Sequence, residues 1–151
     1  MNFEFKHFND LTVDELYDIL KLRAEIFVVE QNCVYNDLDK LDKEAMHMFY
    51  KKGDKIIAYS RLLKPGTRFP DYSIGRVVVK KEERGTGLGI KMMEEAKKFI
   101  VQNWKADTIK ISAQKYLQQF YENLDFKVIT EEYLEDGIPH FGMKYYTECA
   151  D

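Results

Sequence analysis

The sequence has 151 residues, a length that suits one domain with a single core. Hydrophobic residues make up 45% of the chain and aromatic residues 14%, a composition that excludes an intrinsically disordered protein. The formal net charge of −3 provides no basic footprint for nucleic acid, so we expect no nucleic-acid partner.

The sequence predicts neither a membrane segment nor a second domain. The first residues, Met1–His7, lack the apolar core of a signal peptide, and no apolar run approaches the roughly 18 residues of a membrane span. No linker-like stretch interrupts the chain, so we expect residues 1–151 to form one domain. Cys33 and Cys149 lack metal-ligand spacing, and we expect reduced thiols, no bound metal and a cytoplasmic protein.

The first half of the chain predicts a strand, a helix and a hairpin. Phe3 and Phe5 alternate with polar residues, as in a half-buried strand. Thr12–Glu15 has the form of a capping box, which predicts the start of a helix. The apolar face of that helix comprises Leu16, Ile19, Leu20 and Phe27. Residues 46–50, which include His47, and residues 55–63 predict two strands joined by a turn at Lys52–Asp54.

The second half predicts an alternation of strands and helices. Strands are expected at residues 74–79 and 108–113, and apolar residues at helical spacing predict a helix from about residue 88 to 103. A second apolar stripe predicts a short helix and comprises Leu117, Phe120, Tyr121 and Leu124. Two final strands, residues 127–133 and 141–146, flank a predicted turn at Glu135–His140. A strand, helix and strand in the middle imply a parallel crossover, whereas hairpins at both ends imply antiparallel pairing, so the sheet should be mixed.

The segment Arg84–Gly89 has the sequence Arg-Gly-Thr-Gly-Leu-Gly and joins a β-branched strand to an amphipathic helix. Glycines let the backbone approach a ligand closely, and a helix N-terminus attracts anions, so this segment predicts a phosphate-binding turn. A dinucleotide-binding turn would need a glycine where the chain has Ile90. The spacing also fails the loop of nucleotide triphosphatases, which needs four residues between its glycines.

An Arg-x-x-Gly-x-Gly loop after a strand resembles the coenzyme A pyrophosphate loop of the GNAT family of acetyltransferases. Further segments are similar to the ElaA-type branch of that family: Leu22–Cys33, Ala113–Gln114, Phe120–Tyr121 and Glu135–His140. The resemblance implies an α/β (α+β) domain with a central mixed sheet of about six to seven strands, helices on both faces and a splayed pair of parallel strands. It also implies an enzyme that transfers the acetyl group of acetyl-CoA directly to an amine acceptor, a small amine or a protein amine.

The resemblance implies a coenzyme site along the splayed strand and in the glycine loop. In the family pattern, the pantetheine arm pairs with the strand backbone and the loop cradles the pyrophosphate through backbone N–H groups. The residues that match are Val77, Val78, Val79, Arg84, Gly85, Thr86, Gly87, Leu88, Gly89 and Ile90, together with Tyr121, whose family counterpart points at the coenzyme sulfur. A coenzyme-A-binding module without catalysis, or an interaction domain that keeps only the fold, are the alternatives, and a homodimer would be ordinary.

Acetyl transfer needs a proton donor for the departing thiolate and a base for the amine, because an amine like that of lysine is mostly ammonium at pH 7. Tyr121 is the candidate acid, since its segment is similar to the family's Tyr-x-x-x-Gly-Phe. Asp125 replaces the usual glycine there, and if that position needs a positive φ the helix exit is expected to be less favourable.

Glu30 and His140 are the candidate bases, and either could act directly or through water. Glu30 follows a Phe-Val-Val run, whereas His140 follows Pro139 in the predicted turn. The candidate acceptor-binding residues are Phe27, Glu30, Gln31, Tyr35, Asp136 and His140. His7 is expected at the surface, and Asn36–Lys40 is expected to be a solvated turn.

Overall fold

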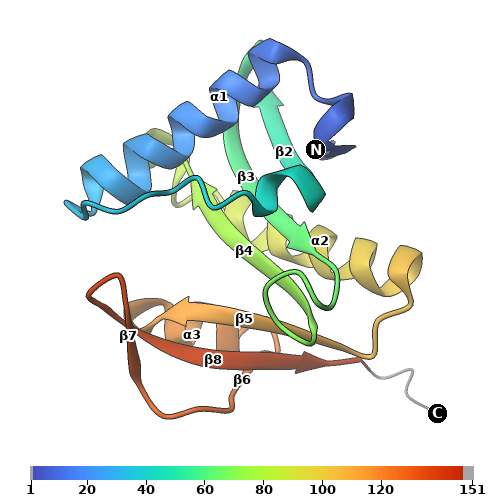
Figure 1. The fold of residues 1–151 in the computed structure, drawn as a ribbon, viewed down its shortest axis with the longest axis vertical. Helices are drawn as coiled ribbons and strands as arrows, with labels where there is room; N and C mark the ends of the chain where they lie inside the picture. Colours follow the sequence, from blue (N-terminus) through green and yellow to red (C-terminus); the bar gives the residue numbers. More distant parts are fainter. Residues whose placement is uncertain (1, 148–151) are drawn as a thin grey trace.

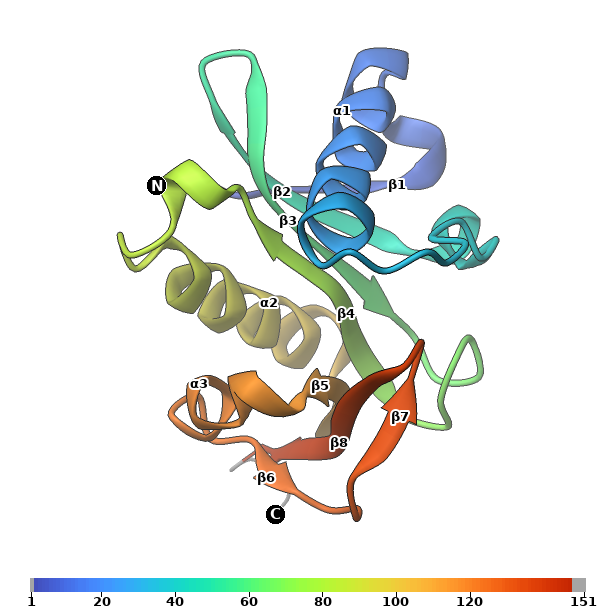
Figure 2. The ribbon, with the colours of Figure 1, turned by 90° about the vertical axis from the view of Figure 1, so that its left-hand side faces the viewer.

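The computed structural model describes residues 2–147, so the prediction for Cys149 lies outside the described residues. Eight strands form one sheet in the order β1-β2-β3-β4-β5-β8-β6, and β7 also pairs with β8 (Figures 1 and 2). The strands are β1 (Glu4–His7), β2 (Met46–Lys52), β3 (Lys55–Leu63), β4 (Tyr72–Val79), β5 (Thr108–Gln114), β6 (Lys127–Val128), β7 (Tyr133–Glu135) and β8 (Ile138–Tyr146). The α-helices are α1 (Val13–Arg23), α2 (Leu88–Trp104) and α3 (Gln118–Glu122).

The mixed sheet is confirmed, since β4 and β5 are parallel and every other pair is antiparallel. The sheet has one strand more than expected because the predicted strand at residues 127–133 divides into β6 and β7. The hydroxyl of Thr130 accepts a hydrogen bond from the N–H of Gly142 at 2.8 Å. A side chain therefore takes the place of a backbone partner, and the ladder is interrupted there.

Helices cover both faces of the sheet, as expected: Figure 2 shows α1 on one side of β2–β4 and α2 on the other. Ile19 and Leu22 of α1 pack with Phe49 and Tyr59, which point to one face. The larger core includes Met92 and Met93 of α2 together with α3, and it fills the opposite face. Successive strand residues point to opposite faces, so one strand such as β3 serves both cores.

The predicted capping box at the start of α1 is confirmed. The Glu15 N–H donates to Thr12 Oγ1 at 3.0 Å, and the Thr12 N–H donates to Glu15 Oε1 at 2.9 Å. Lys6 and Lys51 bind the same buried carboxylate at 3.0 and 2.8 Å. Burial raises the pKa of Glu15, but the two lysines and the Thr12 N–H outweigh it and lower the value to about 2. This contact ties the start of α1 to β1 and β2.

The expectation that Asn36–Lys40 is solvated is correct only for Asn36, Leu38 and Lys40, which are exposed. Asp37 and Asp39 instead join a buried ion-pair network that includes the two fully buried guanidinium groups of Arg23 and Arg61. Asp42 bridges both arginines, at 2.7 Å from Arg23 Nη1 and 3.1 Å from Arg61 Nη1. Buried charges need such partners. The network therefore fixes the loop after α1 against the sheet.

The strands β4 and β5 separate after a short parallel contact. Only Tyr72 with Ile109 and Ser73 with Lys110 are paired, and Figure 1 shows the two strands diverging beyond that end. The β3–β4 register shifts between Tyr59 and Arg61, and Arg76 has a φ of 50°. A bulge bends the strand that carries it. The predicted splayed pair of parallel strands is thereby confirmed.

Candidate active site

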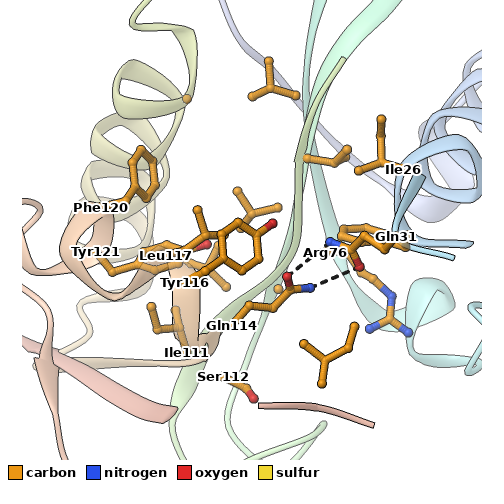
Figure 3. A pocket seen from close by; sticks show the side chains of 18 of the residues that line it. Ile26, Gln31, Arg76, Ile111, Ser112, Gln114, Tyr116, Leu117, Phe120 and Tyr121 are labelled. Atoms are coloured by element: carbon orange, nitrogen blue, oxygen red, sulfur yellow. Dashed lines mark hydrogen bonds between the residues drawn. The ribbon is translucent and has the colours of Figure 1, made fainter. Parts of the chain in front are cut away.

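A cavity of about 490 Å³ occupies the opening between β4 and β5. Its walls come from the segment after α1, from β4, from the glycine loop and the start of α2, from β5 and α3, and from the last hairpin. Figure 3 shows Tyr116, Leu117 and Tyr121 on one side of this space and Gln31 and Arg76 on the other. The splay of two strands thus creates an elongated space with polar groups along it.

The cavity brings together nearly all of the residues proposed from the sequence. Those that line it are Phe27, Glu30, Gln31, Tyr35, Val77, Val78, Val79, Arg84, Gly85, Gly87, Leu88, Gly89, Ile90, Tyr121, Asp136 and His140. Thr86 is not among the lining residues, because its hydroxyl turns back and donates to the Glu83 carbonyl at 2.9 Å. Residues far apart in the sequence therefore meet at one site.

The glycine loop has the backbone geometry of an anion-binding turn. Gly85 and Gly87 have φ values of 80° and 83°, a region that side chains with a Cβ rarely adopt. Gly87 is the N-cap of α2, with no side-chain cap and no acidic residue in the first turn. The free N–H groups and positive end of a 17-residue helix therefore face the cavity without a competing carboxylate in that turn.

Gly89 lies where the start of α2 meets β4 and α3. A Cβ there would lie 3.6 Å from Val79 Cγ2 and 3.7 Å from the end of the Phe120 ring. These are ordinary contact distances, so an alanine at this position would fit without displacing either neighbour. Of the three glycines, Gly85 and Gly87 are required by the backbone conformation, whereas neither backbone strain nor a close contact requires a glycine at position 89.

Arg84 and Glu30 form an ion pair at the edge of the cavity. Arg84 Nη1 lies 2.8 Å from Glu30 Oε2, and Nη2 lies 3.2 Å from Oε1. Arg84 Nε also donates to the Val79 carbonyl at 3.0 Å. The guanidinium is thus held beside the glycine loop by the last residue of β4 and by the segment after α1. One candidate base is therefore paired with the cation of the candidate coenzyme loop.

Tyr121 is 6% exposed, on the cavity wall. Its ring makes edge contacts with Phe120 and Phe126, at centroid distances of 5.1 and 6.0 Å. Within residues 2–147 its hydroxyl makes no hydrogen bond. Burial raises the pKa of this hydroxyl, which keeps it protonated at neutral pH. The arrangement provides a fixed phenol whose proton is available to a bound molecule.

The exit of α3 keeps the geometry expected of a glycine at that position. Asp125 has a φ of 70°, and the Tyr121 carbonyl accepts from the N–H groups of Leu124 and Phe126 at 3.0 and 3.1 Å. The expected positive φ is therefore confirmed, and aspartate tolerates it at some cost. The exit is tight, so Tyr121 is held in position despite the aspartate.

His140 lies in β8 and not in a turn as predicted. The turn observed in the structure consists only of Asp136 and Gly137. Pro139 is accommodated in the strand because β8 pairs there only with the short β7 and, from His140 onward, with β5. His140 is 5% exposed and lines the cavity. Its Nδ1 lies 2.7 Å from the Ile138 carbonyl. A carbonyl only accepts, so Nδ1 carries the hydrogen and Nε2 is left to take up a proton.

The other two histidines lie where the sequence predicted them. His7 is exposed, and His47 is fully buried in β2. His47 Nε2 donates to the Asp42 carbonyl at 2.7 Å, and Nδ1 accepts from the Tyr59 hydroxyl at 2.6 Å. Burial lowers the pKa of His47 below its ordinary value. This histidine is a neutral structural residue.

Gln114 and Arg68 are cavity residues that the sequence did not single out as functional. The amides of Gln31 and Gln114 exchange two hydrogen bonds of 3.2 Å across the opening, which Figure 3 draws as dashed lines. Arg68, from the loop before β4, binds Glu135 of the last hairpin. Gln114 lies in a segment similar to the ElaA-type branch, but that similarity gave it no role, and Arg68 in its loop belongs to no such segment.

Tyr35 and Asp136 border the far end of the cavity. The Tyr35 hydroxyl donates to Asp37 Oδ1 at 2.6 Å, and Arg76 lies 5.7 Å from the Tyr35 ring centroid. The Asp136 carbonyl accepts from Cys33 Sγ at 3.4 Å, which joins the loop after α1 to the last hairpin. The buried ion-pair network therefore supports one wall of this end of the cavity.

Within residues 2–147 there is no group of three or more histidine, cysteine, aspartate and glutamate residues that could hold a metal ion. Nor does any helix in the described part of the chain combine the length and apolar character of a membrane span.

Residues 13–147 match the family described as an acetyltransferase (GNAT) domain. The chain belongs to this family. It is 40% identical to protein ElaA of Escherichia coli over 91% of both chains, and the crystal structure of that protein superposes with a TM-score of 0.87 over 96% of this chain and 99% of the other. An acyl-CoA N-acyltransferase from Pseudomonas aeruginosa is 42% identical, with a TM-score of 0.89 and coverage of 95% and 98%.

The likeness extends to distant structures of the same fold. An aminoglycoside 6'-N-acetyltransferase complexed with coenzyme A shares 12% identity, a TM-score of 0.71 and coverage of 95% of this chain and 96% of the other. At that identity the likeness concerns the fold alone. The resemblance to the ElaA-type branch, inferred from short segments, extends over nearly the whole described chain, as the comparison with ElaA of Escherichia coli shows.

Proposed function

We propose that this protein is an N-acetyltransferase that moves the acetyl group of acetyl-CoA directly to a primary amine. The observation that carries the proposal is the continuity of one cavity from the glycine loop, along β4, to Tyr121 and His140. Such a path can hold a long cosubstrate with its pyrophosphate at one end and its thioester between an acid and a base. Coenzyme A bound to an aminoglycoside acetyltransferase of this fold supports the choice of cosubstrate.

The coenzyme end of the site fits a pyrophosphate. The N–H groups of the glycine loop and of the first turn of α2 would bind its oxygens, with Arg84 beside them. Beyond Ser73, β4 has no strand partner on the side that faces β5. The backbone of Val77–Val79 therefore offers hydrogen-bonding groups to the two amides of the pantetheine arm, while Ile90 and Leu88 line the wall at the loop.

Tyr121 is the proposed acid. Attack by the acceptor nitrogen forms a bond to the acetyl carbon, and the carbon–sulfur bond then breaks to release the coenzyme thiolate. The Tyr121 hydroxyl gives its proton to that sulfur, the acetylated nitrogen loses its extra proton to solvent, and the tyrosinate regains a proton from solvent. Because burial raises the pKa of Tyr121, the tyrosine reaches this step protonated.

His140 is the proposed base. An amine of pKa about 10.4 needs about 4.6 kcal/mol to lose its proton at pH 7, which a nearby base reduces. Nε2 of His140 is free to accept that proton directly or through one water, since Nδ1 is bound to the Ile138 carbonyl. Glu30 is the second candidate base. Its carboxylate is held by Arg84, so it would accept a proton only after Arg84 turns to the phosphates.

The acceptor would enter from the end opposite the glycine loop. Phe27, Gln31, Tyr35 and Asp136 line that end together with His140. Asp136 adds a carboxylate near the opening, which favours a cationic amine over a neutral one. The substrate class proposed is thus a primary amine, either small or presented by a protein.

The direct test is acetyl transfer to a panel of amines that includes monoamines, polyamines and lysine peptides. Release of free coenzyme A thiol is followed together with the mass of the acetylated amine. The proposal predicts thiol release that depends on an amine and is matched by product. If acetyl-CoA binds but no amine becomes acetylated, the protein is a coenzyme-A-binding module and the proposal is wrong.

A further inference from the structure

A polar cluster beside His140 connects three strands and one loop. It comprises Arg68 from the loop before β4, Ser112 of β5, Tyr133 and Glu135 of β7, and His140 of β8. Its members come from separate parts of the chain, and all except Tyr133 line the cavity. The catalytic scheme above uses only the histidine.

The Glu135 carboxylate is directed at the nitrogen that the scheme uses. Glu135 Oε2 lies 3.5 Å from His140 Nε2, which is within ion-pair distance when the ring is protonated. Since Nδ1 already donates to the Ile138 carbonyl, both ring nitrogens of the protonated form have an acceptor. Neutral His140 has a hydrogen on only one nitrogen and therefore leaves Glu135 without its donor.

The other oxygen of Glu135 is fixed independently. Arg68 Nη2 and Ser112 Oγ both donate to Glu135 Oε1, Ser112 at 3.2 Å. The Tyr133 hydroxyl lies 2.6 Å from Ser112 Oγ and, because that serine donates onward, serves as its donor. The Tyr133 ring also stacks on the imidazole, with a centroid distance of 6.1 Å and an interplanar angle of 21°. The carboxylate and the ring are therefore oriented by different contacts of one cluster.

We propose that Glu135 is a supporting residue that stabilises the His140 imidazolium after the ring has taken the proton of the acceptor. This inference rests on the proposed function, in which His140 is the base. No bond other than N–H changes: the proton moves from the acceptor nitrogen to Nε2, and the new N–H donates to Glu135 Oε2. Arg68 and Ser112 keep the carboxylate in place, so it is not drawn away by the acceptor's own charge.

The charged and titratable groups around the His140 imidazole decide whether Glu135→Gln favours or disfavours its protonated form. Glu135 is the carboxylate nearest to it, Arg68 lies behind that carboxylate, and Cys33, Tyr35, Arg76 and Asp136 line the same end of the cavity. An opposite charge favours the protonated imidazole. Glu135→Gln removes that charge and leaves Arg68 in place, so the protonated ring loses a stabilising partner.

The test compares Glu135→Gln with Glu132→Gln as a matched control. Glu132 lies three positions away, pairs with Lys115 at 2.7 Å, is 43% exposed at its side chain and does not line the cavity. In Glu135→Gln the acidic limb of the kcat profile should move to lower pH, and kcat at pH 7 should fall about tenfold. The KM of Glu135→Gln for acetyl-CoA should stay within about twofold of the wild-type value. Glu132→Gln should match the wild type in the pH profile, in kcat and in KM.

Nuclear magnetic resonance titration of the imidazoles provides a readout that does not depend on turnover. The chain has 3 histidines, so the signals can be assigned with His7→Gln and His140→Gln. The His140 titration should move to lower pH in Glu135→Gln, while that of the exposed His7 stays unchanged. An unmoved His140 titration, or an equal movement in Glu132→Gln, overturns the inference even if the activity falls. If the wild type transfers no acetyl group but the His140 titration still moves to lower pH in Glu135→Gln, the proposed function is wrong, whereas the pairing of Glu135 with His140 stands.

Discussion

Glu30 and Arg84, which are 54 positions apart, meet in a two-pronged ion pair with N–O distances of 2.8 and 3.2 Å. One residue follows α1, and the other begins the glycine loop. In the proposed complex the coenzyme phosphates compete with Glu30 for the same guanidinium. The pair therefore opposes coenzyme binding by the free energy of its own formation, which for a partly exposed pair is at most about 1 kcal/mol.

Glu30→Gln should tighten acetyl-CoA binding by about two- to fivefold, because it frees Arg84 and removes a negative charge near the phosphates. Arg84→Gln should weaken binding by about tenfold, and the double variant should resemble Arg84→Gln. Calorimetric dissociation constants measure all three. A large loss of kcat in Glu30→Gln with an unchanged dissociation constant would instead make Glu30 the base.

Tyr121→Phe should lower kcat by about 10²-fold and leave acetyl-CoA affinity within about twofold, since only the proton donor is lost. The ring contacts with Phe120 and Phe126 remain, so the unfolding temperature should change little. Steady-state kinetics and calorimetry measure the two effects. Equal turnover in the wild type and the variant would remove Tyr121 from the mechanism.

Gly87→Ala should weaken coenzyme binding by about tenfold, because a Cβ at a φ of 83° strains the turn that presents the N–H groups. Gly53→Ala is the matched control. Gly53 has a φ of 64°, its Cβ would also meet no atom within 4 Å, and it lies in the β2–β3 turn away from the cavity. Both variants should lose about 1 kcal/mol of unfolding free energy. Equal coenzyme affinity in both variants would contradict the role of the loop.

Protein stability should fall as the pH decreases below about 6.5, because His47 is buried as a neutral ring. Folding lowers the pKa of His47, so the unfolded chain binds the proton more tightly and acid favours the unfolded state. The folded state is therefore most stable above the pKa of His47 in the unfolded chain, and it loses this stability as the pH falls towards the pKa in the folded protein. His47→Gln should flatten the dependence of unfolding free energy on pH below about 6.5. An unchanged slope would show that another group is responsible.

The elements that carry local signals could be predicted from the sequence. The capping box at Thr12, the glycine loop and the strand at residues 74–79 depend on neighbouring residues, and the structure contains all three. The predicted turn at Glu135–His140 was too long, because its last residues pair with β7 and β5. Local pattern does not reveal which strand lies beside a segment.

The contacts that shape the site could not be predicted, because they join residues that no local pattern relates. Gln31 meets Gln114 over 83 positions, and Cys33 meets Asp136 over 103. The aspartates of the loop after α1 looked solvated, since their arginine partners lie in other elements. Each of these pairs depends on how the two halves of the sheet diverge. The cavity residues could be named individually, but their pairing required the fold.

Thermal unfolding in the presence of acetyl-CoA, NAD or ATP measures which of these molecules the cavity binds. At about 100 times the dissociation constant a ligand stabilises the folded state by about 2.7 kcal/mol, which for this size is about 5–10 °C. Acetyl-CoA should give such a shift, and NAD or ATP at the same concentration should give none. No shift with acetyl-CoA, or an equal shift with ATP, would contradict the assignment of the glycine loop and the opening between β4 and β5 to coenzyme A.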